Sequence, residues 1–243
     1  MIFDASGFVF EPPPVISRAR RVLIKPSAAY PVPYPVTTSQ GMLSAIIEGI
    51  RRISDADILL LAGTPGGEPI FPVYQALGYD FPRVLTLDVN DCVWVEVDNP
   101  LPKPLVVPTF WVPNVILSCD YLITVAPLKV VKGKASLSIM NLLSVLPSAK
   151  YERGAPRGWK SLYGLGIAKV IADLYFTLPF DLGIIEASQK FIASDDPTKG
   201  EAENYGKVFV GEPYEVDSQV VRELGLKSSH LDLIKEARVG LEG

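Results

Sequence analysis

Two lysines that could bind an anion, Lys129 and Lys132, lie in the short basic segment PLKVVKGK at residues 127–134. The segment follows a predicted buried strand over residues 120–125 and precedes a predicted helix over residues 136–146. Ligands of open α/β sheets bind at the carboxyl ends of strands, and a helix N-terminus favours an anion. The segment therefore predicts a phosphate or carboxylate site, with a solvated basic loop as the alternative.

A second group of polar residues surrounds the end of the first predicted strand, residues 21–25. Lys25 ends this strand, and Thr37 and Thr38 follow a proline-rich stretch and open a predicted helix over residues 39–53. These side chains could contribute to the same anion site. An ordinary surface lysine and helix capping are the simpler interpretations.

Carboxylates lie at or near the ends of several predicted strands and helices. If they converge, they could bind magnesium or act as acid and base, whereas solvation or capping is the simpler role for each one. They are Asp88, Glu186, Asp195, Asp196 and Asp217. The glycine-rich segment GTPGG at residues 63–67 could also bind an anion through its N–H groups, but it matches no nucleotide fingerprint and is interpreted as a tight turn.

Composition limits the class of protein. The 243 residues are 48% hydrophobic and carry a formal net charge of -4, which predicts a sizeable core and no nucleic-acid partner. We expect a single domain over residues 1–243, in the cytoplasm, because no apolar run or signal-peptide pattern predicts membrane insertion or export. The 22 prolines would suit a thermostable protein.

The chain has too few cysteines and histidines for several kinds of metal or catalytic site. Cys92 and Cys119 are interpreted as buried free thiols, with one disulfide as the alternative, so no iron–sulfur cluster is expected from this chain alone. His230 is the only histidine, which argues against Ser–His catalysis or a two-histidine metal site. Its place in an amphipathic C-terminal helix predicts a surface position.

The order of predicted elements indicates the fold class. Apolar runs at residues 57–62, 84–88 and 182–186 alternate with helical patterns, which predicts an α/β fold with a mostly parallel sheet and flanking helices. Residues 92–118 differ, with alternating and proline-separated pieces that predict an antiparallel excursion or small β subdomain. We also predict a helix over residues 162–177, loops at 148–160 and 194–206, and a short strand at 207–210.

Four stretches together resemble one known family, the domain of unknown function 362, over about residues 20–226. They are VLIKPS with PVPYPVTTSQGMLSAIIEGI, then CDYLITVAPLKVVKGKASLSIMNLLSVLP, KVIADLYFTLPFDLGIIEA and GKVFVGEPYEVDSQVVRELG. Many members carry a cysteine-rich ferredoxin-like module and are described as iron–sulfur centre proteins. This chain has no such module, which weakens the redox association.

The resemblance also singles out individual positions. Those that match the family's pattern are Lys25, Thr37, Thr38, Asp120, Lys129, Asn141, Asp173, Glu186 (where the family prefers Asp) and Asp217. Val131 and Met140 stand where the family has His and Lys. The absence of this His and this Lys favours a protein that binds a ligand over one that catalyses a reaction.

Two functions stay open at this point. The first is an enzyme or former enzyme that binds a small anion through Lys25, Lys129 and Lys132, with Asn141 orienting it and Asp88 or Asp217 as base or metal ligand. The second is a non-catalytic binding or scaffold subunit of a redox or iron–sulfur system, docking a redox protein through residues 92–116. A weaker third option places a cluster between Cys92 and Cys119 across a homodimer interface. The cofactor, the oligomeric state and the existence of any reaction are undetermined.

Overall fold

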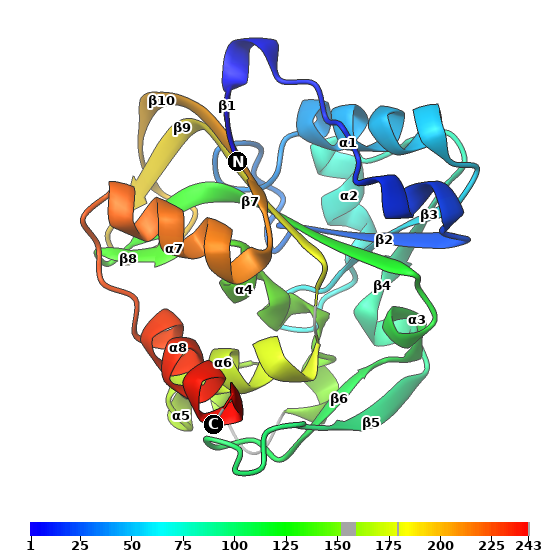
Figure 1. Cartoon of the computed structure of the whole chain (residues 1–243). Helices are drawn as coiled ribbons and strands as arrows, with labels where there is room; N and C mark the ends of the chain where they lie inside the picture. Colours follow the sequence, from blue (N-terminus) through cyan, green and yellow to red (C-terminus); the bar gives the residue numbers. More distant parts are fainter. Residues whose placement is uncertain (152–158, 179, 243) are drawn as a thin grey trace.

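The computed structural model describes residues 1–151, 159–178 and 180–242 of the 243-residue chain. Its main feature is an eight-stranded sheet with the strand order β1-β10-β9-β7-β2-β3-β4, in which β8 pairs with β7 (Figure 1). The strands are β1 (Ile2–Asp4), β2 (Arg21–Pro26), β3 (Asp57–Ala62), β4 (Val84–Asp88), β7 (Tyr121–Val131), β8 (Lys134–Ser136), β9 (Leu182–Ala193) and β10 (Gly200–Gly211). The pairs from β9 to β4 are parallel, whereas β1, β8 and β10 pair antiparallel. The predicted α/β fold with a mostly parallel sheet is confirmed.

Strands β2, β3 and β7 are buried on both faces, as their continuous apolar sequences indicate, whereas the edge strand β4 is partly exposed. Alternate residues of β2 enter different cores. Val22 and Ile24 pack with the helices on one face, and Leu23 packs with those on the other. The end of β2 is thus enclosed by helices and connections on both sides.

Helices α1 (Gln40–Ile53) and α2 (Phe71–Leu77) cover the first face. Ser39 caps α1, because its hydroxyl accepts a hydrogen bond from Met42 N at 3.0 Å, and Gly78 ends α2 in the left-handed conformation with φ of 71°. The second face is covered by α4 (Ser138–Asn141), the 3-10 turn η4 (Leu142–Val145), α5 (Lys160–Gly164), α6 (Ile167–Thr177) and α7 (Pro213–Glu223), with α8 (Ser229–Glu242) packed on α6. Shorter elements are η1 (Ala5–Gly7), η2 (Pro14–Arg18), η3 (Val89–Asp91), α3 (Asn114–Leu117) and η5 (Ser148–Lys150).

Strands β5 (Trp94–Asp98) and β6 (Thr109–Pro113) form a separate two-stranded antiparallel sheet, which confirms the predicted excursion. Alternate side chains of this hairpin pack into the second core, namely Val95, Val97, Phe110 and Val112. On its other face Lys150 Nζ lies 3.8 Å from the ring centroid of Trp111 and 5.8 Å from that of Trp94. This cation–π contact fixes η5 against the hairpin.

The basic segment at residues 127–134 has a different structure from the one predicted. β7 continues to Val131, and the chain turns at Lys132 and Gly133, with φ of 52° and 70°, into β8. The helix predicted at residues 136–146 is shorter than expected, because β8 includes residue 136 and only residues 138–145 are helical, as α4 followed by the 3-10 turn η4. The reason is tertiary: β9 extends alongside and pairs with the end of β7 from Leu128 to Val131.

Four further element predictions differ from the structure in their bounds. The predicted loop at 194–206 and short strand at 207–210 belong mostly to a long hairpin of β9 and β10, whose polar residues are exposed and include a Lys190–Glu203 ion pair of 2.7 Å. The predicted helix at 162–177 is divided into α5 and α6 at Gly166, where φ is 86°. The predicted loop at 148–160 begins with η5, and residues 152–158 lie outside the described part of the chain.

His230 is buried, not exposed as the sequence predicted. Only 6% of its surface is accessible, and its Nδ1 lies 3.1 Å from the hydroxyl of Ser228. The neighbouring Leu231 and Ile234 enter the second core, so the buried face of α8 begins at His230. Burial lowers the pKa of the imidazole to about 4.

We expect this buried imidazole to make the protein acid-sensitive. The unfolded chain takes up a proton near pH 6.5, whereas folded His230 stays neutral until about pH 4. Stability should therefore be lost as the pH falls from 6.5 to about 4, by about 3 kcal/mol if this site acts alone. Urea unfolding at several pH values should show a flatter profile in His230→Leu. Equal slopes in both proteins would contradict the assignment.

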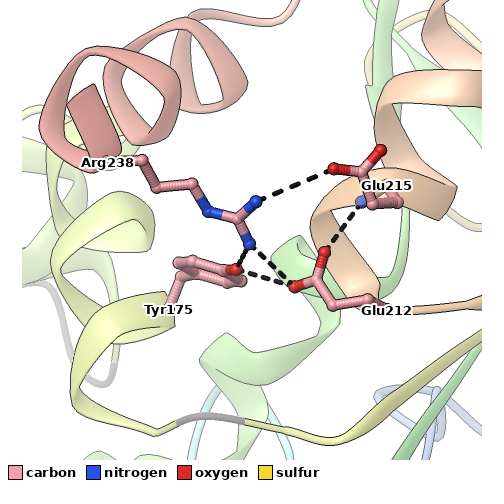
Figure 2. Close-up of polar contacts among 4 residues, drawn as sticks. All are labelled: Tyr175, Glu212, Glu215 and Arg238. Atoms are coloured by element: carbon pink, nitrogen blue, oxygen red, sulfur yellow. Dashed lines mark hydrogen bonds and ion pairs between the residues drawn. The ribbon is translucent and has the colours of Figure 1, made fainter. Parts of the chain in front are cut away.

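One polar network joins three helices (Figure 2). Arg238 of α8 donates hydrogen bonds to Tyr175 of α6 and to Glu212 at 3.1 Å, and it lies 3.8 Å from Glu215. Glu212 also caps α7 through Glu215 N and accepts the hydroxyl of Tyr175 at 2.7 Å. The guanidinium stacks 4.3 Å from the centroid of Tyr214. These contacts hold α8 against α6 and the start of α7. They also give the polar side chains of Arg238, Tyr175 and Glu212 hydrogen-bonding partners.

Within the described ranges, no helix combines the length and the apolar character that crossing a bilayer requires.

Candidate functional site

The strand order reverses at β2. From β2 the chain moves outward to β3 and β4 on one side, and it later enters β7 and β9 on the other side. β2 and β7 are parallel neighbours, and Pro26 pairs with Val125 at the end of β2. In open α/β sheets the crevice outside such a switch point is where ligands bind. Several sequence-predicted site residues meet at this position.

Lys25 lies at the end of β2 and is completely buried. Its Nζ donates hydrogen bonds to Asn141 Oδ1 at 2.7 Å and to Pro26 O at 2.9 Å. Burial lowers the pKa of this amino group well below its usual value, and the charge of Lys129 lowers it further. The two lysines are thus close enough to interact electrostatically.

Asn141, at the end of α4, is held in one orientation. Its Nδ2 donates to Lys25 O at 3.2 Å, to Val125 O at 3.1 Å and to Thr124 Oγ1 at 3.2 Å. These acceptors fix the amide so that its Oδ1 faces the Lys25 amino group. Thr124, which the sequence analysis did not select, completes this support by donating to Ser138 O at 3.0 Å.

Lys129 lies in the part of β7 that extends past β2. The residue is 8% exposed, and its Nζ donates to Val36 O at 3.1 Å. Burial lowers the pKa of Lys129 to about 8, so the group is mostly protonated at neutral pH.

Residues 27–38, called the arm below, connect β2 to α1 across this edge of the sheet. Thr38 Oγ1 accepts from Ser27 N at 2.9 Å and donates to Val125 O at 3.0 Å. Thr37 Oγ1 donates to Val32 O at 2.6 Å. The hydroxyl of Tyr79, which the sequence analysis did not select, donates to Thr38 O. The threonines therefore hold the arm closed, while capping of α1 falls to Ser39.

Glu186 of β9 lies under the start of α1. Its Oε2 accepts from Ser39 N at 2.9 Å, and burial raises the pKa of its carboxyl to about 7. Its charge also contributes to raising the pKa of Tyr79, so the carboxylate lies near the arm. A carboxyl that titrates near neutrality can exchange protons at physiological pH.

Lys132 lies away from Lys25 and Asn141. It occupies the hairpin turn between β7 and β8, its side chain is 63% exposed, and it pairs with the exposed Asp195 at 3.1 Å. Asp196 is likewise engaged locally, by Thr198 and Lys199. These residues form a solvated tip of the hairpins.

The structure does not bring the three candidate aspartates together. Asp88 accepts from Ile70 N and Asn90 N, both at 2.8 Å. Asp217 accepts from Ser138 N, Ser138 Oγ and Ile139 N, and burial raises its pKa to about 7. Asp173 accepts from Asn99 Nδ2 and from the N–H groups of residues 105–107 at 2.8–2.9 Å. Each carboxylate thus anchors backbone in its own part of the fold.

In the described part of the chain, no three residues among His, Cys, Asp and Glu are grouped in a way that could hold a metal ion. Cys92 and Cys119 are half-buried free thiols that donate to Asp88 O and Val115 O, each at 3.2 Å. Burial is the main cause that raises the pKa of both thiols to about 11, so both are poor nucleophiles.

Comparison with known proteins identifies the family. A model of the family described as "Domain of unknown function (DUF362)" matches residues 22–222. This chain belongs to that family. No curated protein matches it.

A solved structure shares the fold of this DUF362 protein. It is the lactate racemase apoprotein from Thermoanaerobacterium thermosaccharolyticum, with 14% sequence identity and a TM-score of 0.51. The similarity covers 84% of this chain and 49% of that chain. The DUF362 chain thus spans about half the length of the racemase, and the likeness concerns the fold alone.

The two positions that lack the expected His and Lys of DUF362 carry apolar side chains. Val131 packs with Val36 and Phe191 in a small cluster beside the arm. Met140 packs against the second core next to Asn141. The segment GTPGG is a turn in which Thr64 Oγ1 donates to Glu68 O at 2.6 Å.

Proposed function

We propose that this DUF362 protein binds a small phosphate- or carboxylate-bearing ligand where β2 and β7 end. The observation that supports this most is the pair of buried lysines, Lys25 and Lys129, on neighbouring strands of the switch point. Within the described ranges, no carboxylate lies within 4.0 Å of either amino group. A bound anion would supply the missing counter-charge for Lys129, which is mostly protonated at neutral pH.

The energetic cost of burying a cationic amino group also supports an anion-binding site. Burying a cationic group without a counter-ion disfavours folding by several kcal/mol, and proteins normally avoid it or pair the charge. Perturbed amino groups in a crevice are more common at functional sites than in ordinary cores. Lys129, still mostly protonated at neutral pH, is the better candidate for direct contact with the anion.

The size of the ligand follows from the enclosure. Lys25 is completely buried and Lys129 nearly so, so a ligand that contacts them has to be small enough to be enclosed with them. The racemase of related fold acts, as its name says, on lactate, a small carboxylate, which is consistent with this class. The match covers only half of that chain, so it supports the class of ligand and not the racemase activity.

We expect anion binding to depend on the protonation of Lys129. Its pKa is about 8, so affinity for sulfate or lactate should be constant below pH 8 and fall by up to about tenfold per pH unit above it. Calorimetric titrations across this range would measure the profile. Protonation on binding should also appear as proton uptake, which makes the measured heat depend on the ionisation enthalpy of the buffer.

Two matched variants complete this test. Lys129→Met should weaken binding at pH 7 by about tenfold or more, because the buried cation is lost. Lys132→Met removes an exposed lysine from the same segment and should leave the affinity unchanged. Equal effects of both variants, or no binding of sulfate, phosphate or lactate to the wild-type protein, would overturn the proposal.

The alternative function, a non-catalytic subunit that docks a redox protein through residues 92–116, has less support. The apolar side chains of β5 and β6 that alternate inward pack into the protein's own second core. On the other face Lys150 covers Trp111. No specific contact in this region favours a partner.

A further inference from the structure

The hydrogen bonds of Lys25 match a neutral amine. In the described part of the chain its Nζ has two acceptors, Asn141 Oδ1 and Pro26 O. A neutral amine has two N–H donors and a lone pair, whereas an ammonium has three N–H donors. The third N–H of an ammonium would be buried without an acceptor. The contacts therefore leave Nζ with its lone pair free.

The surroundings of Lys25 favour the same state. The side chain is fully enclosed, and the nearby cation of Lys129 disfavours a second positive charge. Desolvation beside another cationic group is an arrangement that turns a lysine into a nucleophile. Asn141 acts as a positioning residue, because its fixed amide directs the amino group.

Building on the proposed function, we propose that Lys25 forms an imine with the carbonyl carbon of a small oxo acid whose carboxylate pairs with Lys129. The amine nitrogen attacks the carbonyl carbon and a C=N bond replaces the C=O bond. The carbonyl oxygen leaves as water with both hydrogens of the amine. No oxidant or reductant is required.

The same contacts provide a route of entry. Lys25 is completely buried, so the oxo acid reaches it only when the chain around it moves. The arm begins at Ser27, directly after the Pro26 carbonyl that Lys25 contacts. Lys129 holds the arm through Val36 O at 3.1 Å. A carboxylate that competes for this ammonium releases Val36, and the arm can then open. Binding of the carboxylate and exposure of the nucleophile are thereby coupled.

Borohydride trapping tests this inference on the intact protein. Wild-type protein is incubated with pyruvate or levulinate, which differ in the spacing of carbonyl and carboxylate, and is then reduced. Peptide mass spectrometry should find an adduct on Lys25 whose mass is that of the acid less one water plus two hydrogens. Lactate, which lacks the carbonyl, should give none. Lys129→Met should reduce the yield by about tenfold or more, in line with its weaker anion binding.

The outcomes separate the two proposals. Adducts on Lys129, or spread over exposed lysines such as Lys132 and Lys150, would overturn the assignment to Lys25, as would the absence of any adduct. Calorimetry without borohydride measures the binding of the anion independently of imine formation. Binding of pyruvate or lactate without an adduct would refute the imine and keep the anion site, whereas absent binding would refute the proposed function itself.

Discussion

Lys25→Met is expected to stabilise the protein at neutral pH while abolishing the imine adduct. Methionine fills a similar volume without a group that must lose its charge on burial, and each unit by which the pKa is lowered corresponds to about 1.4 kcal/mol. The loss of the hydrogen bonds to Asn141 and Pro26 offsets part of this gain. We expect a net increase in the free energy of unfolding, measured by urea denaturation at pH 7.

The pH dependence distinguishes this explanation from a simple packing effect. The unfolded state holds a proton on Lys25 up to about pH 10.5, whereas the folded state releases it at a lower pH. Wild-type stability should therefore rise with pH in this window, and its deficit relative to Lys25→Met should shrink toward pH 10.5. Lys132→Met is the matched control and should change stability by no more than about 0.5 kcal/mol. A destabilised Lys25→Met at pH 7 would contradict the assignment of a neutral, functional amine.

Asp173→Ala is expected to have the largest destabilising effect of the candidate aspartate substitutions. Four donors, Asn99 Nδ2 and the N–H groups of residues 105–107, converge on this fully buried carboxylate. Removing it leaves buried donors without acceptors, so the free energy of unfolding should fall by about 3–5 kcal/mol. Asp173→Asn should also destabilise, because each oxygen accepts two donors and an amide NH₂ would face two N–H groups.

Asp120→Asn provides the comparison for Asp173. Asp120 accepts from Arg20 N and Arg21 N at 2.7 and 3.0 Å, but its carboxylate is exposed, so water can replace the lost contacts. The expected loss is below about 1 kcal/mol. If Asp173→Ala unfolds like the wild-type protein, the carboxylate does not anchor the connection between β5 and β6, and its role as an acid or ligand gains support.

The candidate site was accessible to sequence reasoning in part. Lys25 could be assigned to a strand end, because the apolar run before it and Pro26 after it define the strand. Its partner Asn141 was selected only through the family resemblance, because the local pattern of residues 136–146 does not show that this side chain reaches the end of β2. Thr124 offered a signal that was not used, a hydroxyl inside an otherwise apolar strand, and it supports Asn141.

Lys129 and Lys132 show why the spacing of charged residues in the sequence did not reveal which of them is buried. Both lie in the same basic segment, yet Lys129 is buried in β7 and Lys132 is exposed in the turn that follows. The difference arises because β9 extends beside β7 and converts the expected loop into paired strands. Such long-range pairing depends on residues far apart in the chain, which local patterns do not record.

The sequence by itself determined the class of fold. Continuous apolar strands alternating with amphipathic helices specify a mostly parallel sheet, because only buried strands and one-sided helices can satisfy those patterns. It also predicted an anion site in the basic segment at residues 127–134. Only the tertiary structure decided which lysine of that segment is enclosed, and that Lys25 and Asn141, 116 positions apart, meet at 2.7 Å. Burial and the position of charges relative to one another are properties of the packed chain, and they set the chemistry of these amino groups.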